Sequence, residues 1–231
     1  MSILLVASTA AEIAPVCAGF GIELPRTCKA GYVAERGELA VLVCGVGQLQ
    51  CGVSLARLLE KMRVDAVVSA GIAGSFTADL RPPRTVLVKE EVLADLGAET
   101  DEGWLDLFQI GLADPDQEPF SSGMLMADAA LLSSPAVAGL PAVRSITVNT
   151  VLSRPDSIER ARVKYNPQIV NMEGGAVFYV CLSKKLPFIE IRSISDMVGA
   201  RDKTKWQVEE AISALNAVLA NLLDSLVHGR T

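Results

Sequence analysis

The sequence predicts a single α/β domain, residues 1–231, in which helices cover both faces of a central sheet. Three observations lead to this prediction. The length of 231 residues is typical of one α/β domain. Half of the residues are hydrophobic but only 5% are aromatic, which indicates a large core of aliphatic side chains. Short apolar runs alternate with amphipathic stretches along the chain, and no internal repeat or flexible linker interrupts them.

Six short runs are predicted to form the strands. Most of them are continuously aliphatic or β-branched and do not alternate with polar residues. Such runs are typical of strands that helices cover on both sides. The predicted strands are residues 3–7, 39–44, 66–70, 84–93, 143–148 and 188–193.

Amphipathic stretches between these runs are predicted to form the helices. The fourth begins with Pro155, which fits the first turn of a helix. The last carries an apolar stripe that includes Val208, Ile212 and Leu215, so we expect it to pack on the sheet without a catalytic role. The predicted helices are residues 12–19, 48–62, 127–132, 155–164, 173–184 and 205–227.

Residues 94–123 depart from this pattern. They contain many acidic residues, two prolines and little periodicity. We expect an excursion from the sheet, with one short helix around residues 104–109. Such a segment either covers a site, forms a subunit contact, or is a solvated loop.

Composition and charge exclude several classes of function. The formal net charge is −6, whereas a nucleic-acid partner demands a clustered positive face, so we expect none. The one histidine, His228, lies near the C-terminus, which argues against histidine-based catalysis; we expect no metal and no cofactor. The five cysteines form no CxxC pair and are predicted to be buried reduced thiols.

The N-terminal apolar run has no basic region before it and is soon interrupted by Glu12. It is therefore predicted to be a strand and not a signal peptide. No uninterrupted apolar run reaches membrane-spanning length. We expect a cytoplasmic protein without a membrane partner.

Two glycine-rich segments follow predicted strands. In the first, Gly45, Gly47 and Gly52 have the spacing GxGxxxxG, which differs from the GxGxxG of dinucleotide-binding folds. The second is residues 69–75. Two such turns at the carboxyl ends of strands indicate a ligand that the backbone approaches closely, although each could also be only a tight strand-to-helix turn.

Two acidic residues stand at positions that favour a functional role. Glu173 opens a predicted helix and precedes two glycines, so it either favours the helix N-terminus or is a carboxylate at a cleft. Asp196 follows a predicted strand and is either a helix cap or a general acid at the edge of the sheet. The position of Glu12 does not distinguish it from the other acidic residues.

Six motifs follow one another along nearly the whole chain. They are Glu12 and residues 44–47, 69–74, 147–151, 171–176 and 192–203. In this order they resemble the nucleoside phosphorylase and nucleosidase superfamily, to which Met-Glu-Gly followed by Ser-x-Ser-Asp is specific. The extension at residues 198–206 resembles most closely the futalosine hydrolase branch. Asn149 stands where methylthioadenosine nucleosidases usually carry Asp, which argues against that branch.

The resemblance implies a three-layer α/β/α domain around a central mixed, largely parallel sheet. It implies hydrolysis of the N-ribosidic bond of futalosine, which releases hypoxanthine and dehypoxanthine futalosine in menaquinone biosynthesis. Asp196 would protonate the leaving purine at N7, Glu12 would activate or orient the water, and Glu173 would hold the ribose hydroxyls. The other implied substrate-binding residues are Met172, Gly74, Asn149, Val151, Leu152 and Ser195.

Phosphorolysis is the rival reaction within this superfamily, and it needs cationic groups that hold phosphate. Residues 70–79 contain no Arg or Lys, which favours water as the acceptor. The carboxylated group of futalosine would favour a cationic side chain in its binding site. Arg201, Lys203 and Lys205 are candidates. Alternatively, they are only the solvent-exposed residues at the start of a helix.

Two other functions remain open at this point. They are a methylthioadenosine or adenosylhomocysteine nucleosidase and a non-catalytic nucleotide-binding module. Because the superfamily is commonly dimeric or higher, the resemblance implies a homo-oligomer.

Overall fold

The computed structural model describes residues 1–101, 103–127, 135–199, 202, 204 and 206–229. Most of the helix predicted at residues 127–132 lies outside the described residues. So do Arg201, Lys203 and Lys205, the three candidates for binding a substrate carboxylate.

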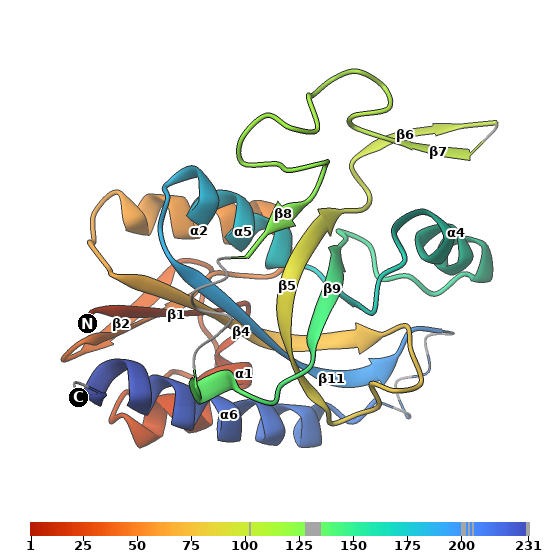
Figure 1. Ribbon diagram of the computed structural model, residues 1–231. Coiled ribbons are helices and arrows are strands. Elements are labelled where there is room, and N and C mark those ends of the chain that lie inside the picture. Colours follow the sequence, from red (N-terminus) through yellow and green to blue (C-terminus); the bar gives the residue numbers. More distant parts are fainter. Residues whose placement is uncertain (102, 128–134, 200–201, 203, 205, 230–231) are drawn as a thin grey trace.

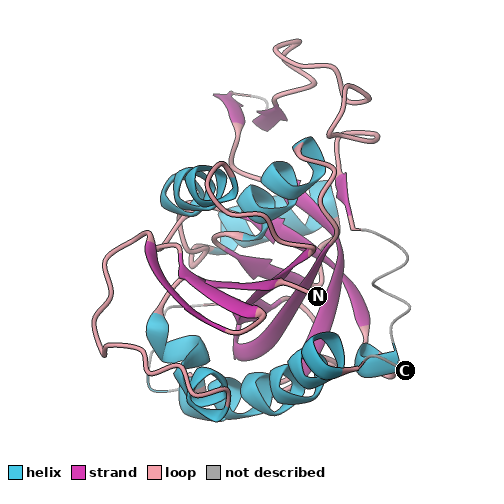
Figure 2. Cartoon of the chain, turned by 90° about the vertical axis from the view of Figure 1, so that its left-hand side faces the viewer, coloured by secondary structure: helices cyan, strands magenta, loops and turns pink. Residues whose placement is uncertain are grey.

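Helices cover both faces of a central sheet, as the sequence predicts. The helices are α1 (Ala10–Gly19), α2 (Gln48–Leu59), α4 (Pro155–Tyr165), α5 (Gly174–Ser183) and α6 (Val208–His228). Helices α2 and α5 pack together on one face, and α1 and α6 pack together on the other (Figure 1, Figure 2). Helix α4 lies beside the sheet, near β9 (Figure 1).

The central sheet is mixed and has nine strands within the described part of the chain. Its members are β1 (Ile3–Ala7), β2 (Tyr32–Arg36), β3 (Leu39–Val43), β4 (Ala66–Ser75), β5 (Thr85–Leu93), β8 (Leu125–Met126), β9 (Ala142–Thr147), β10 (Ile169–Asn171) and β11 (Phe188–Met197). The order is β10-β9-β5-β11-β4-β1-β3-β2, with β8 paired to β5. Strands β11, β4, β1 and β3 are parallel neighbours, whereas β5 runs antiparallel to β11. Strand β10 also pairs with β4, so this part of the sheet closes on itself.

The core is aliphatic and lies on both sides of the sheet. Strands β1 and β3 are buried along their whole length, which explains their continuous apolar runs. Leu55 of α2 and Val177 of α5 belong to the cluster on one face, and Ile13 of α1 and Leu215 of α6 to the cluster on the other. The cysteines are free thiols, and all except Cys28 are buried.

Helix α6 is long and apolar enough to cross a membrane by length and composition alone, although the sequence shows no uninterrupted run of that kind. Core helices of globular proteins pass the same test. Here Ala211, Leu215, Leu219, Leu222 and Leu223 of α6 are buried in the core.

Residues 94–123 leave the sheet, but the short helix predicted at residues 104–109 is wrong. A hairpin of β6 (Gly97–Thr100) and β7 (Gly103–Asp106) forms instead. The chain then turns at Asp106, whose Oδ1 accepts the backbone N–H groups of Phe108 (3.1 Å) and Gln109 (2.8 Å). Asp side chains commonly stabilise turns in this way, at the expense of a helix.

The prediction that a strand ends at Ala70 is also wrong, because β4 continues to Ser75. The second glycine-rich segment is therefore part of a strand and not a turn. Its glycines lie against β11, where Gly71 pairs with Arg192 and Gly74 with Asp196. Glycine inside a strand allows such close approach by neighbouring side chains.

Candidate active site

A cavity of about 320 Å³ opens at the carboxyl edge of the sheet, where β1, β4, β10 and β11 end. Ligands of α/β proteins commonly bind at this edge. Eight of the predicted site residues line the cavity: Glu12, Gly74, Val151, Leu152, Met172, Glu173, Ser195 and Asp196. The described lining residues include three carboxylates and no lysine or arginine.

Glu12 lies in the first turn of α1, directly after β1. Its Oε2 accepts hydrogen bonds from the Ser8 hydroxyl (2.6 Å) and from the backbone N–H and hydroxyl of Thr9 (both 2.9 Å). Its Oε1 accepts the Ile72 backbone N–H at 3.2 Å. Thr9 and Glu12 have capping-box spacing, so the side chain that stabilises the helix start is also held at the cavity.

Glu173 is the N-cap residue of α5. Its backbone N–H and that of Gly174 donate to Oδ1 of Asn171 at 2.9 and 2.6 Å. Its side-chain Oε1 accepts the backbone N–H of Gly47 at 2.8 Å, so the first glycine turn contacts a side chain of the site. Burial raises the pKa of Glu173, although the charge of Arg192 opposes this rise.

Asp196 reaches the cavity because β11 contains an irregularity. Ile194 pairs with Ala73 and Asp196 with Gly74, so Ser195 is an extra residue in β11, as in a β-bulge. A Cβ at Gly74 would make its tightest contacts with Cγ2 of Val198 (3.2 Å) and Cγ1 of Val170 (3.3 Å), so glycine there relieves crowding of these apolar side chains beside Asp196. The Ser195 hydroxyl donates to Oδ1 of Asp196 at 2.7 Å. Burial raises the pKa of Asp196, and the bond from Ser195 opposes the rise.

A buried charged cluster around Arg192 lies behind the cavity. Arg192 is 1% exposed and donates from Nε to Oε1 of Glu190 (3.0 Å) and from Nη2 to the Ser69 hydroxyl (3.4 Å). A Cβ at Gly71 would lie 2.2 Å from Nη1 of Arg192 and 3.0 Å from Oε1 of Glu12. The guanidinium and the Glu12 carboxylate therefore both border the space that Gly71 leaves.

The carboxylates of this cluster keep Arg192 charged. Burial works against its charge, but Glu190, Glu173 and Glu12 outweigh burial and raise the pKa of the guanidinium above its ordinary value. The sequence signal for this cluster is the pair of charged residues Glu190 and Arg192, which alternate with the apolar Ile189 and Ile191 in a buried strand.

Gly174→Ala is expected to lower the free energy of unfolding by about 1–3 kcal/mol, because a Cβ there would overfill a packed interior. It would lie 2.3 Å from Oε1 of Glu91 and 2.6 Å from Oε1 of Glu190, and both side chains are fully buried. Gly19→Ala at the end of α1 is the matched control, since no described atom lies within 4 Å of a Cβ there. Chemical denaturation measures both variants, and equal stability would contradict the predicted crowding.

The structure does not place Asn149 in the cavity, contrary to the sequence-based expectation. Asn149 is exposed, and its Nδ2 donates to Oδ1 of Asp95 at 3.2 Å. Its backbone N–H also donates to the Asp95 carboxylate. The backbone N–H and the side-chain amide of Asn149 thus both bind Asp95, near the start of the excursion. Asn149 is therefore not part of the described cavity lining.

Several lining residues were not predicted. Thr9 could have been found from its capping-box spacing to Glu12. The start of α6 also reaches the cavity, although the sequence suggested only a packing role for this helix. The lining residues missed are Ser8, Thr9, Ala11, Val46, Ile72, Ala73, Val148, Val170, Asn171, Met197, Val198, Gly199, Trp206, Val208 and Ile212. Among the described residues, no group of three or more His, Cys, Asp or Glu could hold a metal ion.

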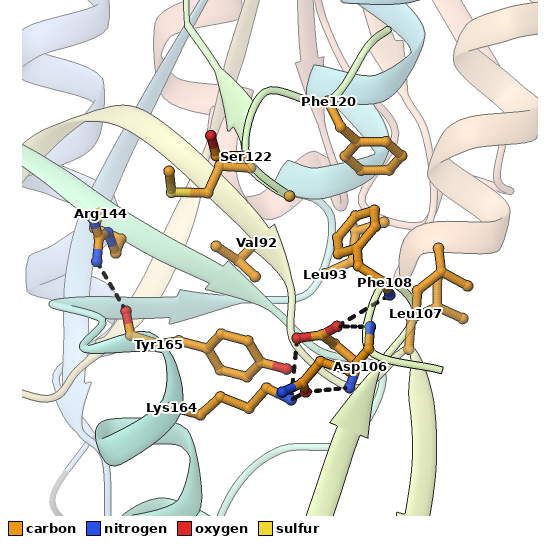
Figure 3. A pocket seen from close by; sticks show the side chains of 14 residues that line it. Val92, Leu93, Asp106, Leu107, Phe108, Phe120, Ser122, Arg144, Lys164 and Tyr165 are labelled. Carbon is orange, nitrogen blue, oxygen red and sulfur yellow. Dashed lines mark hydrogen bonds and ion pairs between the residues drawn. The ribbon is translucent and has the colours of Figure 1, made fainter. Parts of the chain in front are cut away.

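A second cavity of about 320 Å³ lies between the excursion, β5 and α4. Phe108 and Phe120 lie on one side of it and Arg144, Tyr165 and Lys164 on the other (Figure 3). Its charged groups are paired within the chain: Lys164 Nζ lies 3.1 Å from Asp106 Oδ2, and Arg144 Nε lies 2.7 Å from Glu90 Oε1. The excursion therefore borders this second cavity, and none of its described residues lines the cavity with the three carboxylates.

Comparison with known proteins gives one family. Residues 2–228 match the family described as the phosphorylase superfamily. A futalosine hydrolase of Thermus thermophilus is 31% identical over 197 residues, which cover 83% of this chain and 86% of that protein. A 5'-methylthioadenosine/S-adenosylhomocysteine nucleosidase of Colwellia psychrerythraea is 28% identical over 212 residues, 85% of each chain. The crystal structure of a nucleosidase of this kind from the same organism, in complex with adenine, superposes with a TM-score of 0.75 at 22% identity and covers 98% of this chain and 96% of that one.

Proposed function

The chain belongs to the phosphorylase superfamily, and on this premise we propose that it hydrolyses the N-ribosidic bond of futalosine, releasing hypoxanthine and dehypoxanthine futalosine. At the coarser level the protein is a nucleosidase, an N-glycosyl hydrolase related to futalosine hydrolases and methylthioadenosine nucleosidases. The observation that carries the proposal is the meeting of Glu12, Glu173 and Asp196 in one cavity.

Asp196 is the general acid in the proposed reaction. A purine leaves poorly as an anion, so protonation at N7 assists cleavage. A carboxyl group can supply this proton near neutral pH only if its pKa is raised. Burial raises the pKa of Asp196 in that direction, and this supports the assignment.

Glu173 and Glu12 act on the ribose side. Cleavage develops positive charge on the sugar ring, which nearby carboxylates stabilise. Glu173 accepts hydrogen bonds from the ribose hydroxyls. Met172 lies beside it in the cavity wall. Glu12 orients and deprotonates the attacking water. Its Oε2 is held by three hydrogen bonds, so its orientation is set before the substrate binds.

Water, and not phosphate, is the acceptor in this proposal. A phosphate site requires cationic donors. The described cavity lining contains three acidic side chains and no lysine or arginine. Arg192 lies behind the cavity, and its Nε is directed at Glu190. The described lining therefore offers phosphate no charged donor.

The choice of futalosine rests on two features of the sequence. The segment that follows Asp196, residues 198–206, resembles futalosine hydrolases, and Asn149 replaces the Asp that methylthioadenosine nucleosidases usually carry. Apolar side chains of Val148, Val151 and Leu152 line the cavity and suit the flat face of a purine.

Base release distinguishes the candidates. We expect hypoxanthine to appear from futalosine, at the same rate with and without inorganic phosphate, when products are separated by chromatography. Inosine and methylthioadenosine serve as parallel substrates. Release of adenine from methylthioadenosine, with futalosine left intact, would replace the proposal by the methylthioadenosine nucleosidase. A strict need for phosphate would replace hydrolysis by phosphorolysis.

A further inference from the structure

A fully buried carboxyl group, Glu91 of β5, lies beneath the candidate active site and has no role in the reaction described above. Its Oε2 accepts the Thr147 hydroxyl at 2.8 Å, and its Oε1 accepts Nδ2 of Asn171. Neither partner is charged, and a hydroxyl can also accept, so a proton on Oε2 can make the contact with Thr147 instead. The neighbouring Glu90 pairs instead with Arg144, at 2.7 Å.

The two partners of Glu91 hold the N-terminus of α5. Oδ1 of Asn171 accepts the backbone N–H groups of Glu173 and Gly174, and the Thr147 hydroxyl oxygen accepts that of Gly175 at 2.7 Å. Free N–H groups at a helix start require such acceptors. One carboxyl group thus orients the two side chains that position the backbone of Glu173.

The charges around Glu91 favour its neutral form. Glu190 faces it from β11, because Oε1 of Glu91 and Oε1 of Glu190 border the same space beside Gly174. Arg192 of β11, Glu173 at the start of α5 and Glu12 of α1 interact with one another in the adjoining cluster. Arg192 directs its Nε at Glu190 and not at Glu91. Glu190, Glu173 and Glu12 already act on the Arg192 guanidinium, so ionisation of Glu91 beside Glu190 would leave a charge uncompensated in the interior, which is costly.

We propose that Glu91, in its neutral form, is a positioning residue that fixes Asn171 and Thr147, and through them the N-terminus of α5 and the ribose-binding carboxylate of Glu173. This role rests on the proposed nucleosidase function. Burial, reinforced by Glu190, raises the pKa of Glu91 to about 8, although the bonds from Ser145, Thr147 and Asn171 oppose the rise. Glu91 therefore carries its proton at neutral pH and loses it in alkali.

Glu91→Gln and Glu91→Leu test the proposal. A glutamine amide has the shape of a protonated carboxyl. Its oxygen accepts from Asn171, and its NH₂ group stands where a protonated Oε2 would donate to the Thr147 hydroxyl oxygen. Only an ionised Glu91 would instead accept at both oxygens. Leucine has neither a donor nor an acceptor. Glu90→Gln, on the same strand but paired with Arg144, is the matched control.

Near pH 6.5, Glu91→Gln is expected to stay within a few-fold of wild type in kcat and KM for base release. Glu91→Leu is expected to lose about 10²-fold in kcat/KM, with KM raised, because a displaced Glu173 binds ribose poorly. A purely structural loss would only reduce the active fraction, which lowers kcat and leaves KM unchanged.

The pH dependence gives a second readout. The ratio of kcat/KM for Glu91→Gln to that of wild type is expected to rise as pH increases through about 8, because only wild type ionises there. The requirement for protonated Asp196 is common to both proteins and cancels in the ratio. Glu90→Gln should show a flat ratio.

A third readout does not depend on activity. A pKa that folding raises gives stability that is complete below the unfolded pKa and is lost as pH rises toward the folded pKa. Between about pH 5 and about pH 8, the Tm of wild type should therefore fall relative to that of Glu91→Gln.

Three results would overturn the proposal: a flat activity ratio for Glu91→Gln, a Tm difference that does not change with pH, or a Glu91→Gln enzyme as impaired as Glu91→Leu at pH 6.5. If Glu91→Leu does not fold, Glu91→Gln still decides the question. Failure of the proposed function is a separate outcome, since wild type would then release no base from any nucleoside while the unfolding measurement still tests the neutral Glu91.

Discussion

Asp196→Asn is expected to lower the turnover of base release by about 10²-fold or more, since asparagine can donate a hydrogen bond to a purine nitrogen but cannot transfer a proton. The carboxyl reaches the cavity through the irregularity at Ser195. Asparagine has nearly the same shape, so we expect the fold and the binding of nucleoside to be retained.

The pH profile connects this loss to proton donation. Burial raises the pKa of Asp196, so the active protonated form is present at lower pH and is lost as pH rises through that raised value. Wild-type kcat should fall on the alkaline side, and the residual activity of Asp196→Asn should lack that fall.

Ser195→Ala is the matched control for Asp196. It removes the hydrogen bond of 2.7 Å that lowers the pKa of Asp196. We expect a small change in turnover and an alkaline limb displaced to higher pH. Activity of Asp196→Asn close to that of wild type would remove the assignment of the acid.

Glu12→Gln is expected to lower kcat by about 10²-fold to 10⁴-fold, because the variant lacks the base that activates water. The amide also cannot accept hydrogen bonds on both sides, as the carboxylate does from Thr9 and from the Ile72 backbone N–H. Loss of the charge at the helix start should cost up to about 1 kcal/mol of stability, which denaturation measures separately.

Ser8→Ala is the control for Glu12. It deletes one hydrogen bond, from the Ser8 hydroxyl, and keeps the carboxylate. We expect a much smaller loss of kcat than in Glu12→Gln. If the two variants lose kcat equally, Glu12 acts through its orientation and not as a base. If Glu12→Gln retains the kcat of wild type, Glu12 is only a helix cap.

Local hydrophobic patterns in the sequence were sufficient to predict most of the strands and helices. The continuous apolar runs at β1 and β3 predicted strands buried on both sides, because burial on both faces removes the need for alternating polar residues. The hairpin of β6 and β7 was missed, because its conformation depends on pairing between strands and on contacts with α4, such as the ion pair of Lys164 with Asp106.

The three carboxylates differ in how far the sequence reveals them. Glu173 and Asp196 could be suspected from their places at the start of a helix and the end of a strand. Glu12 was chosen through family resemblance alone, because its neighbours in sequence are those of any capped helix. Asn149 was chosen by motif position and instead bonds to Asp95, 54 positions earlier in the chain.

The sequence alone determined the fold class, the order of most strands and helices, and the types of residue available for chemistry, since these depend on short-range hydrophobic periodicity and capping. Only the tertiary structure decided which acidic residues are buried together and which of them can keep a proton. Glu91 and Asn171 are 80 positions apart, yet they are hydrogen-bonded in the interior. The charge of a buried carboxyl depends on the dielectric and the charges around it, and folding alone brings those neighbours together.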